Sequence, residues 1–170
     1  MRKKTMKKII LSLLLLTSPL TVMAQAANIH VHGYVTALPC ELEKANYLID
    51  LKKVNVWNIR DTQTSPWVDF TIKLKNCPVD TQEAMMVING TPDNVVTNYF
   101  INSGSAKNVA LNLAYGENKI TVKNGEKITA PVNTQTRTVE IPLSARMAGY
   151  GTGMTGGSFK SHLDFTLIYN

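Results

Sequence analysis

Hydrophobic and polar residues alternate with a period of two in several stretches of the chain. The alternation is clearest in residues 67–77, where Val68, Phe70, Ile72 and Leu74 lie on one face and polar side chains lie on the other. A strand that is buried on one face produces this pattern. The pattern recurs, less clearly in the first case, in residues 46–56, 83–90, 108–115, 137–146 and 159–170. Between these stretches lie clusters of Gly, Asn, Asp, Pro and Ser, the residues that turns require.

About seven short strands in one domain-sized chain predict an all-β fold, and an immunoglobulin-like β-sandwich fits best. Outside the first residues of the chain, no stretch of helical length keeps a 3.6-residue period. Pro142 lies on the outward face of its predicted strand, which a sheet tolerates only near an edge or a bulge. The sequence shows no repeat, linker or second domain.

Residues 1–24 have the layout of a secretory signal peptide. Five basic residues precede the apolar run 9–16, which is too short to span a bilayer, and small residues follow. Cleavage after Ala24 and cleavage after Ala26 both satisfy the small-x-small rule, and an uncleaved signal anchor is the alternative. We therefore expect an exported chain of about 145 residues with a single core.

The predicted leader also explains the basic balance of the sequence. It holds five of the 18 Lys and Arg residues and none of the 12 Asp and Glu residues, so 13 basic groups face 12 acidic ones in the remainder. A net charge this small gives no support to nucleic-acid or membrane-surface binding.

The only two cysteines are Cys40 and Cys77. In an oxidising compartment, one disulfide is the most economical use of such a pair. It would close a loop of about 38 residues, which stabilises the fold by about 4 kcal/mol in the loop-entropy model. A metal site is the rival interpretation, although there is no CxxC and no third ligand nearby.

A further alternating stretch, residues 27–37, lies just after the predicted leader, and the last predicted strand runs to Asn170. A core strand at the end of the chain leaves an apolar edge uncovered, which proteins normally avoid. Two arrangements would cover it. The N-terminal strand could fill the groove of another copy, or it could fold back into its own domain, and the pattern alone leaves both open.

Four blocks of sequence resemble the chaperone–usher pilins of Gram-negative fimbriae. "HGYVTALPC" (32–40) is similar to the NGxVxxxPC block at the start of pilin domains, and "LKNCPVDT" (74–81) is similar to their second-cysteine block. The central strands, "VINGTPD" and "SGSAKNVALNL", and the C-terminus, with a penultimate Tyr169 and Gly157 fourteenth from the end, also match. Small adaptor subunits of type 1 fimbrial tips are the most similar subclass.

The resemblance implies an immunoglobulin-like sandwich that lacks its last strand, with a donor-strand extension at residues 25–37 and a pilin domain at 38–170. A periplasmic chaperone, an outer-membrane usher and neighbouring fimbrial subunits would be its partners, and the cell surface its destination. The donor strand would use Ile29, Val31, Gly33 and Val35. The groove edge read by the chaperone would comprise Gly157, Leu163, Phe165, Leu167 and Tyr169.

Other candidate chemistry in the sequence is weak. "GTGMTG" (151–156) matches G-x-G-x-x-G, but a strand rather than a helix is predicted after it. His30 and His32 would form an incomplete metal clip. Trp57 and Trp67 could stack on a sugar, although core or interface positions are commoner for tryptophan. We expect no catalytic residues, metal, cofactor, nucleic acid or small-molecule substrate.

The predicted function is therefore a structural subunit of an adhesive fimbria, assembled by donor-strand exchange, of the minor or adaptor kind. A major shaft pilin is the alternative within the family. A terminal adhesin and a self-contained periplasmic sandwich that binds glycans are the alternatives from other classes.

Overall fold

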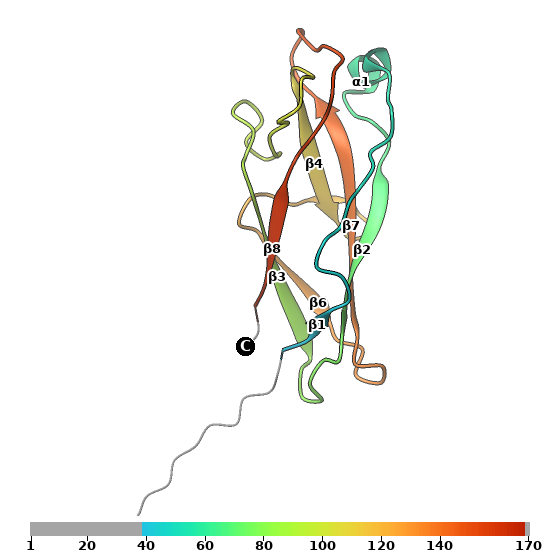
Figure 1. Cartoon of the computed structure of the whole chain (residues 1–170), viewed down its shortest axis with the longest axis vertical. Helices are drawn as coiled ribbons and strands as arrows, with labels where there is room; N and C mark the ends of the chain where they lie inside the picture. The colour runs from blue at the N-terminus through green and yellow to red at the C-terminus, as the bar shows by residue number, and fades with distance from the viewer. Residues whose placement is uncertain (1–38, 169–170) are drawn as a thin grey trace, which may run out of the picture. The chain divides into compact units, whose positions relative to one another are not determined.

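The computed structural model describes residues 39–168 (Figure 1). The predicted leader, the predicted donor strand with Ile29, Val31, Gly33 and Val35, the two histidines of "HVH", and Tyr169 lie outside the described residues.

Two antiparallel sheets form the domain. The larger sheet has the order β1-β2-β7-β4-β5 and the smaller has the order β6-β3-β8. The strands of the larger sheet are β1 (Glu41–Leu42), β2 (Val68–Lys75), β7 (Val139–Gly149), β4 (Val109–Tyr115) and β5 (Ile120–Thr121). The strands of the smaller sheet are β6 (Lys127–Pro131), β3 (Glu83–Gly90) and β8 (Leu163–Ile168).

Alternate residues of the strands face each other between the sheets and form the main core. Ile72 and Leu74 of β2 and Ile141 and Leu143 of β7 meet Met86 of β3, all nearly inaccessible to solvent. The predicted inward faces of β2 and β7 are therefore confirmed. Taken together, the two layers confirm the predicted all-β sandwich.

Pro142 does not lie on an edge strand, because β7 pairs with β2 on one side and with β4 on the other. The prediction that Pro142 marks an edge strand is therefore wrong for β7. The proline is tolerated locally because the ladder between β4 and β7 ends at the pair Tyr115–Leu143, one residue before Pro142. Beyond that point the missing proline N–H breaks no ladder on the β4 side, and the Pro142 carbonyl accepts from Gly116 N at 3.1 Å.

The strand predicted over residues 46–56 is not formed. Residues 44–54 run without regular structure, and a short helix, α1 (Val56–Thr62), follows. The Asn55 side chain caps α1 by accepting from Trp57 N at 3.0 Å, and Ile59 buries its inner face. Two turns are too short for a helical period to show in the sequence.

The predicted disulfide is confirmed. Cys40 is bonded to Cys77, with their Cα atoms 4.1 Å apart, so the start of the domain is tied to the residues that follow β2. We call this end of the sandwich, with Cys40, Cys77 and the β2–β3 connection, the disulfide end. The opposite end carries α1 and is called the α1 end (Figure 1).

Candidate functional site

The two sheets end at neighbouring edges that no described strand covers. Strand β8 is an edge strand of the smaller sheet and pairs only with β3 among the described strands. Residues 43–51 continue from β1 along the edge of the larger sheet. The Glu43 N–H donates to Lys73 O at 3.0 Å, and Lys73 N donates to the Tyr47 hydroxyl at 3.3 Å. Within residues 39–168, no backbone–backbone hydrogen bond joins residues 44–51 to a strand.

Each edge presents a row of half-buried apolar side chains. In β8, three inward residues are half-buried whereas Asp164 and Thr166 between them are exposed. Residues 46–51 show the same alternation without a ladder, and Leu48 is 99% exposed. The half-buried residues that pack against the main core from these edges are Tyr47, Ile49, Leu51, Phe159, Leu163, Phe165 and Leu167.

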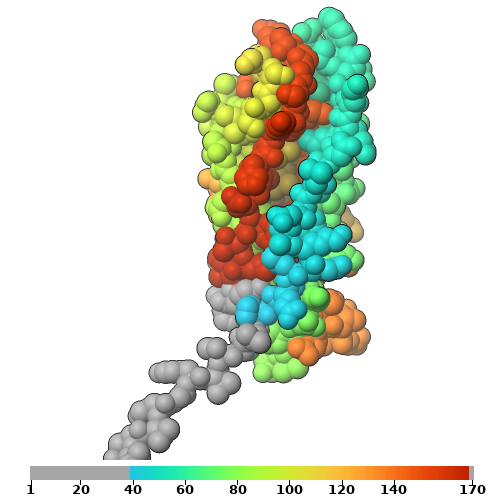
Figure 2. Space-filling model, in the orientation of Figure 1, coloured from blue at the N-terminus to red at the C-terminus, as the bar shows by residue number. Residues whose placement is uncertain are grey.

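We call the space between β8 and residues 43–51 the edge groove. Figure 2 shows the two segments flanking a furrow, β8 in red and residues 43–51 in cyan. Its walls are the two half-buried rows, one on the edge strand β8 and one on residues 43–51, and no described strand pairs with either wall on the groove side. An extended peptide is the ligand that such a site fits, because it supplies main-chain hydrogen bonds to the edge and alternate side chains to the core.

The structure brings together three of the predicted groove-edge residues, Leu163, Phe165 and Leu167, on the inward face of β8. Gly157 lies elsewhere, in the loop before β8. A Cβ on Gly157 would lie 2.5 Å from Ala106 N and 2.7 Å from the carbonyl carbon of Ser105. The residue is therefore a glycine because two backbone segments meet there, and a side chain would force them apart.

Sequence reasoning missed the opposite wall of the groove. Tyr47, Ile49 and Leu51 belong to a stretch whose alternation was detected but taken for an ordinary strand. The signal was real, since the burial does alternate. What the pattern could not reveal is that the stretch has no partner strand on the β8 side among the described residues.

Two polar clusters lie away from the groove. On the outer face of β2 and β7, the buried Ser144 hydroxyl donates to Asp69 at 2.6 Å and accepts from Lys119 Nζ at 2.6 Å. Hydrogen bonds from Lys119 and Ser144 lower the pKa of Asp69 below its ordinary value. In the second cluster, burial, followed by the nearby Asp93, raises the pKa of Tyr150, whose hydroxyl lies 3.2 Å from that carboxylate.

The remaining sequence candidates fall into structural settings. "GTGMTG" lies in the loop that leads to β8, so no helix follows these glycines. Trp67 lies under the Arg146 guanidinium, 4.0 Å from the ring centroid, and Trp57 is 62% exposed at the α1 end. Residues 39–168 contain no group of three or more His, Cys, Asp or Glu side chains placed to hold a metal ion. No helix in this part of the chain is long and apolar enough to cross a membrane.

The fold and the uncovered groove define a class, the immunoglobulin-like sandwich with an incomplete edge. No family model matches the chain. Among curated proteins, it is 30% identical over 145 residues to the uncharacterized fimbrial-like protein YdeR of Escherichia coli K12, covering 85% of each chain. It is 28% identical over 162 residues to protein FimG of the same strain, covering 95% of each chain.

Solved structures show the same fold. A subunit of a chaperone–usher pilus aligns with a TM-score of 0.67 and 18% identity, over 88% of this chain and 99% of that one. The P pilus adaptor subunit PapF aligns with a TM-score of 0.55 and 18% identity, over 81% of this chain and all of that one. The chain belongs to the fimbrial-like proteins of which YdeR is one. It shares its fold with subunits of chaperone–usher pili, among them an adaptor subunit.

Proposed function

We propose that this chain is an adaptor-type subunit of an adhesive fimbria and that donor-strand exchange through the edge groove assembles it. The observation that carries the proposal is the pairing of two half-buried apolar rows with two uncovered strand edges. One extended strand would fill the groove, and the alternation of residues 27–37 predicts such a strand ahead of the domain.

The chain would act as both acceptor and donor. As an acceptor, its groove would hold a strand from a periplasmic chaperone and, at the outer-membrane usher, exchange it for the extension of the next subunit. As a donor, it would insert Ile29, Val31 and Val35 into a neighbour's groove, with Gly33 at the point where the groove leaves no room for a side chain. The leader, removed after Ala24 or Ala26, would direct the chain to the periplasm and then to the cell surface.

The energetics suit a fibre that must resist force. Burying three aliphatic side chains contributes roughly 1.5–3 kcal/mol each before the cost of ordering the strand. Main-chain hydrogen bonds along the strand add to this, each by roughly 0.5–1.5 kcal/mol. Dissociation is slow because it must break all these contacts together, so the contact between consecutive subunits is kinetically stable. The role is structural, and no catalytic step is part of the proposal.

The insertion direction follows from linear growth. Strand β8 runs from the α1 end to the disulfide end, where its last residue, Ile168, pairs with Met85 near the start of β3. A donor strand parallel to β8 would bring the donor's domain to the disulfide end, where the acceptor's own N-terminal segment is attached. An antiparallel strand places the two connections at opposite ends and permits an open head-to-tail fibre.

Substitution in the extension tests the donor half of the proposal. Gly33→Leu should abolish incorporation into fibres and leave the chaperone complex intact, because the chaperone uses only the groove. His32→Leu, which adds the same side chain at the neighbouring outward position, is the control and should assemble. Fibre incorporation and chaperone co-purification are the measurements. Normal assembly of Gly33→Leu would contradict donor-strand exchange by residues 27–37.

A further inference from the structure

Trp57 and Arg60 form a fixed aromatic and cationic surface at the α1 end. The Trp57 side chain is 62% exposed, and the Arg60 guanidinium lies over its ring, 4.5 Å from the centroid. Arg60 Nη2 also donates to the Met154 carbonyl at 2.6 Å, which fastens the pair to the loop before β8. The main-chain N–H of Trp57 is held by the Asn55 cap.

A surface of this composition is typical of an interface centre. Tryptophan and arginine are enriched among the residues that contribute most to the binding energy of protein interfaces. Here both side chains lie on one short helix, which the buried Ile59 anchors to a satellite core with Val109, Met147 and Met154. The surface formed by Trp57 and Arg60 is therefore ordered before a partner binds, which lowers the entropic cost of docking.

The length of the donor segment identifies the occupant. This chain shows the spacing when it is itself taken as a donor: its alternating stretch ends at Ala37 and its disulfide begins at Cys40. Three residues span at most about 11 Å when fully extended. An antiparallel donor strand finishes at the acceptor's α1 end, so the donor's disulfide end must lie within that distance. Trp57 and Arg60 are thus placed where a second domain has to be.

This chain's own disulfide end shows the chemistry that such an end presents. Val79, in the β2–β3 connection, is 71% exposed, and the exposed carboxylate-bearing Asp80 follows it. Glu41, also exposed, accepts from Asn76 Nδ2 at 2.9 Å, so it adds a second carboxylate beside the disulfide. An exposed aliphatic side chain followed by a carboxylate can meet an indole face that has a guanidinium beside it.

We propose that Trp57 and Arg60 dock the disulfide end of the subunit whose strand fills the edge groove, as a second contact between consecutive subunits. The proposal rests on donor-strand exchange and adds to it an interface between the folded domains. The second contact would restrict rotation about the three-residue connection and would exclude water from the end of the groove.

Site-specific photocrosslinking in assembled fimbriae tests the proposal. The full chain, with a photoreactive phenylalanine analogue in place of Trp57, is expressed with its assembly partners, and crosslinked peptides are identified by mass spectrometry. We expect a crosslink to the segment around the second disulfide cysteine of a neighbouring subunit. The same analogue in place of Ile120, which is 61% exposed and lies on the far edge strand β5, is the control and should not reach that segment.

Three results of the crosslinking experiment would overturn the proposal. Fibres that incorporate the substituted chain but give no crosslink from position 57 would refute the second contact and leave donor-strand exchange intact. A crosslink to another surface of the neighbour would do the same. Failure of the unsubstituted chain to enter fibres would refute the proposed function and the second contact with it.

A second variant tests the same contact by its stability. Trp57→Ala should raise the rate of subunit dissociation roughly tenfold or more and leave binding of a free donor peptide unchanged. Equal loss in both assays would mean that Trp57 only supports the fold.

Discussion

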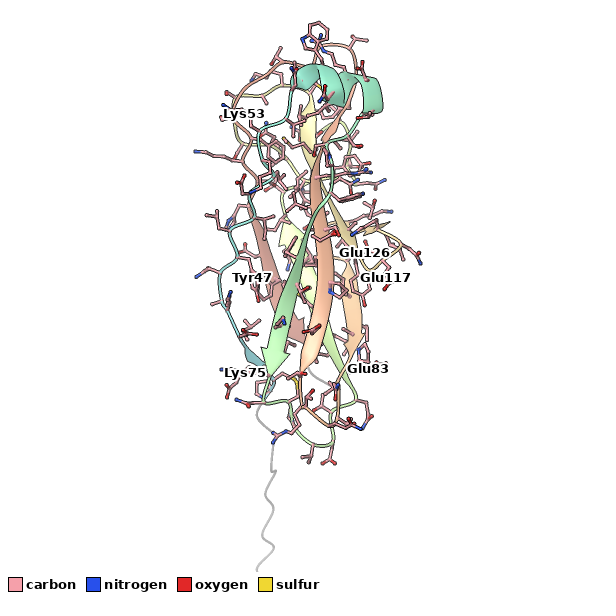
Figure 3. All side chains as sticks on the ribbon, turned by 90° about the vertical axis from the view of Figure 1, so that its right-hand side faces the viewer. Tyr47, Lys53, Lys75, Glu83, Glu117 and Glu126 are labelled. Carbon is pink, nitrogen blue, oxygen red and sulfur yellow. A yellow bond between two sulfur atoms is a disulfide. The ribbon has the colours of Figure 1, made fainter. Side chains whose placement is uncertain are left out.

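Tyr47 and Phe165 meet edge to face across the edge groove, with ring centroids 6.4 Å apart and an interplanar angle of 66°. Tyr47 comes from the unpaired segment beside β2, and Phe165 comes from the inward face of β8 (Figure 3 labels Tyr47). The contact joins the two walls of the edge groove, where a donor strand would insert under the proposed function. A donor strand must therefore displace this aromatic pair before its side chains reach the core.

Removing the Tyr47 ring should make the groove easier to enter. An aromatic pair contributes about 0.5–1.5 kcal/mol beyond its buried area, so Tyr47→Ala should speed association of a donor peptide by about two- to tenfold. Stopped-flow fluorescence with a labelled peptide measures the rate. Leu48→Ala, which changes a neighbouring side chain that is 99% exposed, is the matched control. An association rate equal to that of the control would show that the ring pair is no barrier.

The Cys40–Cys77 disulfide should be needed to hold the groove as well as the core. Reduction opens a loop that contains the whole Tyr47 wall, at a cost of about 4 kcal/mol in the loop-entropy model. We expect Cys40→Ala with Cys77→Ala to lower the melting temperature and to weaken peptide binding together. Calorimetry and peptide titration on the double variant measure both. Lost stability with unchanged peptide affinity would separate the disulfide from the groove.

Acid should weaken the Asp69–Lys119–Ser144 cluster. The folded pKa of Asp69 lies below its ordinary value of 3.8, so the contribution of the ionised carboxylate is complete above that pH and is lost as the pH falls through the lowered pKa. The melting temperature of the peptide-bound domain should therefore exceed that of Asp69→Asn at neutral pH, with the difference shrinking below pH 3.8. Thermal melts of both proteins across this range measure the trend. A difference that stays constant with pH would mean that the charge of Asp69 contributes nothing.

Tyr169, outside the described residues, supports a prediction through the family resemblance alone. If this penultimate aromatic belongs to the edge that the chaperone reads, Tyr169→Ser should weaken chaperone capture and lower the periplasmic level of the chain, because an uncaptured subunit is exposed to proteolysis. Immunoblots of periplasmic extracts with and without co-expressed chaperone measure this. Wild-type abundance of the variant would argue against a role for the C-terminal edge.

Alternation predicted the long strands because each has one buried face. β2, β3, β4, β7 and β8 all lie within predicted stretches or extend them by a few residues. The strands that were missed are short. β1 and β5 have two residues each, and β6 alternates over only five, with Ala130 as one of its two buried side chains. Signals of that length do not stand out from chance in a sequence.

The sequence predicted one of the two walls of the edge groove. Leu163, Phe165 and Leu167 followed from the alternation of the last strand and from the family resemblance. The opposite wall did not, because Tyr47, Ile49 and Leu51 read as an ordinary strand, and only the three-dimensional arrangement shows that its ladder is missing. The sequence marks Trp57 only as a residue that could stack on a sugar. Its place at the α1 end under Arg60, which is itself bonded to Met154, follows only from the structure.

The most direct test of the account is thermal unfolding of residues 38–170, alone and with a synthetic peptide of residues 27–37 or the corresponding strand of a neighbouring subunit. Donor-strand exchange predicts a marginal, poorly cooperative transition for the domain alone and a sharp transition at a much higher temperature once a strand fills the edge groove. Rescue by the chain's own peptide would indicate a self-polymerising shaft subunit, and rescue only by another subunit's strand would indicate an adaptor. A domain that melts cooperatively at high temperature without any peptide would contradict the account, because its sandwich would already be complete.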